Sequence, residues 1–151
     1  MRFPTGAVMA GHLLLPLLAG FTVYVLWRPP TLWLFVWLDH IGLANLVSVA
    51  RDSLGGVGEL LPGVVLYNLP AACWAYSFCA SICLIWRGAA GLQPQVAFAT
   101  ALVVVAVGEA VQVIDVVPGV FDWRDLVADL LAGTAAGFIM SRSVPTSEAS
   151  R

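Results

Sequence analysis

The feature that most constrains this chain is a series of four apolar stretches, each near the length that crosses a lipid bilayer. A transmembrane helix needs about 20 consecutive, mainly apolar residues. Lipid offers no hydrogen-bond partners to the backbone, so such stretches must fold as helices. The sequence therefore predicts membrane spans at about 8–27, 64–86, 96–117 and 124–140.

The composition favours the same environment. Of the 151 residues, 60% are hydrophobic and 11% are charged, whereas soluble domains have about 45–50% apolar and about 25% charged residues. A soluble fold of this size would leave large apolar patches exposed, and such patches aggregate. We therefore predict an all-α fold, a polytopic membrane helical bundle with four transmembrane helices. It forms a single transmembrane domain over 1–142, followed by a polar tail at 143–151.

The long first loop is ambiguous. Residues 31–50 are apolar but are interrupted by Asp39, His40 and Asn45, which favours an amphipathic helix lying in the membrane interface. A fifth span is the alternative. The polar, glycine-rich residues 51–59 predict a solvated loop.

The charged residues bear on the partners of the protein and on its orientation in a membrane. The net charge is −2 and lysine is absent, which argues against nucleic acid as a partner because nucleic acid binds basic surfaces. Four spans would place both termini on one side of the membrane. Four of the seven arginines would share that side, so the positive-inside rule slightly favours termini in the cytoplasm.

Polar residues cluster on the last two predicted spans. Glu109 and Gln112 lie three residues apart on one helix face, and Asp125 and Asp129 lie four apart on another. An ionised acid at the centre of a bilayer costs about 2.5–3.5 kcal/mol on insertion scales, so a chain retains one where it faces protein, water or a ligand. A short turn makes these helices antiparallel neighbours. We expect a polar pocket built from Glu109, Gln112, Asp125 and Asp129, with Asn68 and Tyr76 from the second span.

A purely structural role is the alternative for these polar residues. They would then hydrogen-bond across helices and hold the bundle together, and Asp122 and Asp125 would cap the last helix. Gly133 and Gly137 form a small-residue face for helix packing, against this chain or another subunit. The three cysteines lack metal-site spacing with histidines, so neither a metal nor a cofactor is expected. Since no nucleophile–base set is visible, an enzyme is possible but unsupported.

The segment from about 68 to 140 resembles the VanZ-like membrane proteins. In that family an E-x-x-Q on the third helix is followed by an aromatic–Asp turn, and the fourth helix carries an Asp, a polar residue and a glycine. The resemblance implies four spans in a bacterial cytoplasmic membrane. The family's namesake is associated with glycopeptide resistance, but its biochemical activity is not established. The matching residues here are Glu109, Gln112, Asp125, Asp129 and Gly133.

The chain departs from the family pattern in three ways, one of which is a long insertion from Arg28 to Gly63. The family often has Asn where this chain has Asp129, and a histidine of its second helix has no counterpart here.

Two functions remain open. The pocket would bind membrane lipid, as an amphiphilic envelope ligand or lipid-linked precursor. Alternatively, the chain is a structural accessory subunit of a larger respiratory or photosynthetic membrane complex, with other membrane subunits as partners. Ion transport is weaker, because four short spans leave little room for alternating access.

Overall fold

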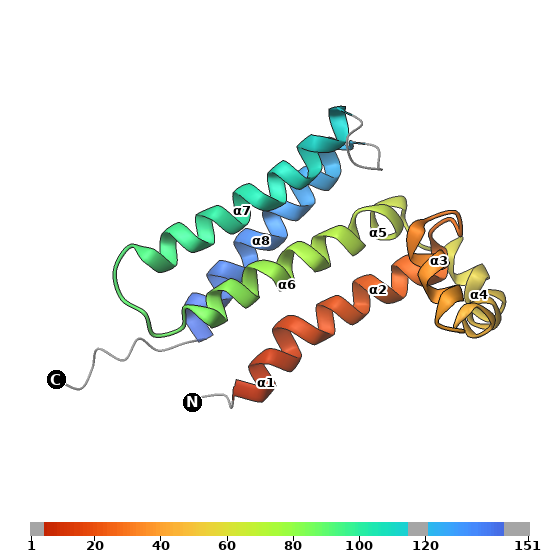
Figure 1. Cartoon of the computed structure of the whole chain (residues 1–151), viewed down its shortest axis with the longest axis horizontal. Coiled ribbons are helices and arrows are strands. Elements are labelled where there is room, and N and C mark those ends of the chain that lie inside the picture. The colour runs from red at the N-terminus through yellow and green to blue at the C-terminus, as the bar shows by residue number, and fades with distance from the viewer. Residues whose placement is uncertain (1–4, 115–120, 144–151) are drawn as a thin grey trace.

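The computed structural model describes residues 5–114 and 121–143, and every regular element in these ranges is a helix (Figure 1). The all-α prediction is therefore confirmed for the described residues. The elements are α1 (Thr5–Met9), the π-helix η1 (Ala10–Leu14), α2 (Leu15–Trp27), α3 (Trp33–His40), α4 (Ala44–Gly58), α5 (Gly63–Tyr67), α6 (Leu69–Ile85), α7 (Gln93–Ala110), the 3-10 helix η2 (Val111–Ile114) and α8 (Trp123–Ser143).

Helix α6 is the central element of the bundle. It packs most extensively against α8 and also contacts α2 and α7. In Figure 1, α6 lies between α2 and α7, and these consecutive long helices alternate in direction. The buried core at this meeting point is made mostly of small residues, so the helix axes can approach closely. Its members are Val8, Cys79, Ala80, Ala101, Ala136 and Met140.

The small-residue face of α8 packs inside this chain. A Cβ atom added to Gly133 would lie 2.8 Å from Leu102 Cδ2 and 2.9 Å from Cys79 Sγ. A Cβ atom at Gly137 would collide with the ring of Phe98. The small-residue face of α8 therefore packs against α6 and α7 of the same chain. The two glycines set how closely α8 lies against these helices.

Within residues 5–114 and 121–143, two helices are long and apolar enough to cross a membrane. They are Gly6–Trp27 and Gln93–Ile114, with mean hydropathies of 1.8 and 2.1. The apolar helix Leu69–Ile85 is shorter, because the chain is interrupted at Asn68 between α5 and α6. Helix α8 has 21 residues but carries four charged side chains, which lower its hydropathy. The last three residues of the third predicted span, 115–117, lie outside the described residues.

The first loop is more helical than the sequence predicts. In place of one helix over 31–50, the structure has α3 and α4, which are separated by a turn in which Gly42 has a φ of +76°. The prediction of a solvated loop over 51–59 is wrong, because α4 continues to Gly58.

The cause of this extension is tertiary contact with the end of α2. Arg51 donates hydrogen bonds from Nη1 to the Val25 carbonyl (3.0 Å) and from Nη2 to the Arg28 carbonyl (2.8 Å). The Trp27 indole N–H donates to the Leu54 carbonyl at 3.3 Å. The two Arg51 bonds satisfy carbonyls at the end of α2. They also hold α4 in place despite glycines that weaken an isolated helix.

Candidate functional site

The acids of α8 are positioned by its N-cap. The Asp122 side chain accepts a hydrogen bond from the Arg124 backbone N–H at 2.9 Å, which is the geometry of a capping residue. The structure thus confirms the capping role considered for Asp122. Helix α8 begins at Trp123, so Asp125 falls in its first turn and Asp129 lies one turn later on the same face.

Asp125 is hydrogen-bonded to a residue at the start of α6. The buried side chain of Asn68 donates a hydrogen bond from Nδ2 to Asp125 Oδ1. Asn68 lies at the interruption between α5 and α6. The pair therefore ties the first turn of α8 to the beginning of α6, and neither residue lines the cavity described below.

We expect that replacing Asn68 with leucine lowers the free energy of unfolding by about 1–3 kcal/mol, because the Asp125 carboxylate loses its donor. Thermal denaturation in detergent measures the change. Asn68→Asp should destabilise at least as much, since two carboxyl groups would then face each other. The double variant Asn68→Asp/Asp125→Asn exchanges the two groups and should recover most of the loss. Wild-type stability in Asn68→Leu would show that the bond contributes nothing.

Asp129 differs from Glu109, Asp122 and Asp125 because its side chain accepts no hydrogen bond from a described residue. Its side chain is 5% exposed, and its buried Oδ1 accepts no hydrogen bond from any described residue. Buried polar atoms in folded proteins are nearly always paired, so an unpaired one needs an explanation. Asp129 is also one of the residues that line a cavity.

This cavity has a volume of about 550 Å³ and lies between α2 and α7, against α6. Its lining is mainly apolar. The hydroxyls of Ser77 and Ser81 are already hydrogen-bonded. Ser77 donates to the Cys73 carbonyl at 2.9 Å, and Ser81 donates to the Phe78 carbonyl at 2.6 Å. The lining residues are Leu13, Leu17, Ala71, Trp74, Ala75, Ser77, Phe78, Ser81, Val104, Val105, Gly108, Glu109 and Asp129.

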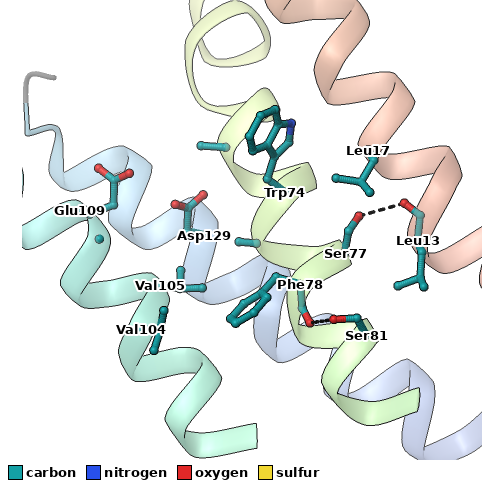
Figure 2. Close-up of a pocket in the computed structure, with 13 residues that line it drawn as sticks. Leu13, Leu17, Trp74, Ser77, Phe78, Ser81, Val104, Val105, Glu109 and Asp129 are labelled. Carbon is teal, nitrogen blue, oxygen red and sulfur yellow. Dashed lines mark hydrogen bonds between the residues drawn. The ribbon is translucent and has the colours of Figure 1, made fainter. Parts of the chain in front are cut away.

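The cavity is polar at one end and apolar at the other. Figure 2 shows the carboxylates of Glu109 and Asp129 toward the same end as the Trp74 indole. The side chains of Phe78 and Val104 lie toward the opposite end. This division matches the chemistry of an amphiphile, which has one polar end and one hydrocarbon end.

The structure brings together only some of the six residues predicted to form the pocket. Glu109 and Asp129 line the cavity. Gln112 lies beside it and donates from Nε2 to Glu109 Oε2 at 3.2 Å. Tyr76 is placed elsewhere, since its hydroxyl is hydrogen-bonded to His12 Nδ1 at 2.7 Å.

The apolar residues that line the cavity, including Trp74 and Gly108, were not predicted from the sequence, because no motif marks them. A glycine next to an acid in an apolar helix is the one signal that suggests open space there.

Within residues 5–114 and 121–143, no group of three or more His, Cys, Asp or Glu side chains is arranged to hold a metal ion. Comparisons of the chain with protein-family models, with curated proteins and with solved structures find no match.

Proposed function

We propose that this chain is a VanZ-like protein with four spans in the bacterial cytoplasmic membrane, and that it binds an amphiphilic envelope lipid in the cavity beside α6. The observation that carries this proposal is Asp129, a buried acid among the residues that line an apolar cavity, whose Oδ1 accepts no hydrogen bond from a described residue. A hydrocarbon chain would lie along Phe78 and Val104. The polar group would then meet Asp129 and Glu109.

The surfaces of the long helices support a lipid environment. Only 22% of the apolar window in Gly6–Trp27 and 6% of that in Gln93–Ile114 is buried within the protein. Lipid would cover the rest, whereas water would leave large apolar patches exposed. The exposed hydroxyls of Thr22 and Thr134 each donate to the carbonyl four residues earlier, at 2.7 Å. That local bond satisfies a hydroxyl that faces lipid.

Helices α6 and α8 would supply the other two spans. At about 1.5 Å per residue, the 21 residues of α8 extend about 30 Å, close to the thickness of the hydrocarbon core. Arg124 and Asp125 lie in its first turn and Arg142 in its last, where side chains can reach the interface. Asp129 lies deeper and faces the cavity instead of lipid. The termini would lie in the cytoplasm.

The residues that resemble the VanZ-like pattern have distinct positions here, which supports that part of the proposal. Glu109 and Asp129 meet at one cavity, and Gln112 holds the Glu109 carboxylate. Gly133 lets α8 pack closely against α6 and α7.

The lipid-binding proposal is tested by filling the cavity from α7. A Cβ atom added at Gly108 would meet nothing within 4 Å, so Gly108→Phe should fold normally while its ring occupies the cavity. Steric exclusion costing about 1–3 kcal/mol lowers affinity by about 5- to 150-fold. We therefore expect native mass spectrometry of gently purified protein to show bound lipid on the wild type and little on Gly108→Phe.

The matched control is Val107→Phe, which adds the same ring at an exposed neighbouring position outside the cavity lining. It should retain lipid as the wild type does. Equal lipid retention in both variants would exclude this cavity as the binding site. Stoichiometric co-purification of other membrane subunits, with no bound lipid, would support the alternative of an accessory subunit.

A further inference from the structure

The polar end of the cavity holds two carboxyl groups and no described arginine. Glu109 and Asp129 line it, and Asp125 lies close enough to repel the charge of both. The arginines of the described residues lie elsewhere. Arg51 binds backbone carbonyls, and Arg124 and Arg142 lie over the rings of neighbouring residues on α8. Arg28 lies over tyrosine rings, and Arg87 lines a different cavity.

This arrangement limits which headgroup can bind there. Oδ1 of Asp129 needs a hydrogen-bond donor, and a buried carboxylate without a compensating partner is costly. An ammonium group supplies three donors and an opposite charge. A phosphate monoester supplies mainly acceptors and adds negative charge next to two carboxylates. Among the polar side chains that line the cavity, only the Trp74 indole N–H would be free to donate to it.

We infer that the cavity selects amphiphiles whose headgroup carries a protonated amine, and that it discriminates against those ending in a phosphate monoester. This inference rests on the proposed function. The ammonium group would lie between Asp129 and Glu109, and the hydrocarbon chain would follow the apolar wall toward Phe78. A cavity of about 550 Å³ is within the usual range for small-molecule sites.

The test uses three probes that share one hexadecyl chain and differ only in the headgroup: hexadecylamine, hexadecanol and monohexadecyl phosphate. Each is titrated into delipidated full-length protein in a neutral detergent, and binding is measured by native mass spectrometry and by thermal shift. Charge-assisted hydrogen bonds are about twice as strong as neutral ones. We therefore expect the amine to bind about tenfold more tightly than the alcohol, and the phosphate to bind most weakly.

Variants assign the preference to the carboxylates. Asp129→Asn should remove most of the preference for the amine, and Glu109→Gln should reduce it if the first variant does not fold. The matched control Asp52→Asn neutralises an exposed acid outside this cavity and should leave the preference unchanged. Gly108→Phe should weaken binding of all three probes, which separates binding in the cavity from partition into detergent.

The outcomes distinguish the preference for an amine headgroup from lipid binding itself. Phosphate binding as tight as amine binding, or an amine preference that persists in Asp129→Asn and Glu109→Gln, would overturn the inference and leave lipid binding intact. If no probe binds, or if Gly108→Phe weakens the binding of none of them, both the amine preference and lipid binding in this cavity are overturned.

Discussion

Replacing Asp129 with leucine is expected to stabilise the ligand-free protein and to abolish its binding of amphiphiles. The Asp129 side chain is 5% exposed, and its Oδ1 accepts no hydrogen bond from the described residues. Burying such a group costs about 1–3 kcal/mol, and an apolar side chain there avoids that cost. The cavity next to it leaves room for the larger leucine. For a chain of this size, each kcal/mol should raise the melting temperature by about 2–4 °C.

A gain in stability together with a loss of binding distinguishes a ligand-binding role of Asp129 from a purely structural one. If Asp129 served only to hold helices together, its removal would lower the melting temperature. Asp129→Asn is the control, because it keeps the shape and polarity of the side chain but removes its charge. It should lose the preference for an amine with a smaller gain in stability. Melting of delipidated protein in detergent and native mass spectrometry provide the two measurements. A lower melting temperature for Asp129→Leu would contradict a ligand-binding role.

Gly133→Val is expected to destabilise the protein by about 1–3 kcal/mol, the usual cost of overpacking a close contact. Its Cβ would fall within 3 Å of atoms of both Leu102 and Cys79, so α8 would have to move away from α6 and α7. Asp129 lies one turn earlier on α8, and such a movement would displace its carboxyl group from the cavity. Thermal denaturation in detergent and retention of bound lipid should therefore both decline.

The control for this effect is Thr134→Val, which introduces the same side chain at the next, exposed position of α8. It removes a local hydrogen bond to the Leu130 carbonyl and should change stability by no more than about 0.5 kcal/mol. Equal melting temperatures for Gly133→Val and Thr134→Val would show that the close approach of α8 does not depend on this glycine.

Much of the candidate site could be anticipated from residue spacing. The positions of Glu109 and Gln112 on one helix face predicted that they could interact, and Gln112 does donate to Glu109. The spacing of Asp125 and Asp129 likewise placed both on one face of α8. Spacing could not reveal that Asn68 pairs with Asp125, whereas the buried Oδ1 of Asp129 accepts no hydrogen bond from a described residue. It also could not reveal that Tyr76 pairs with His12.

The sequence by itself determined that the chain is helical and roughly where its long apolar helices lie, because apolar length and helical periodicity are properties of neighbouring residues. Only the tertiary structure decided that α4 extends through 51–58, since Arg51 and Trp27 must first meet their partners on another helix. Only the tertiary structure decided which polar groups share the cavity, because that depends on how each helix is rotated about its axis. Close packing at Gly133 and Gly137 fixes that rotation for α8, and it involves residues from three helices at once.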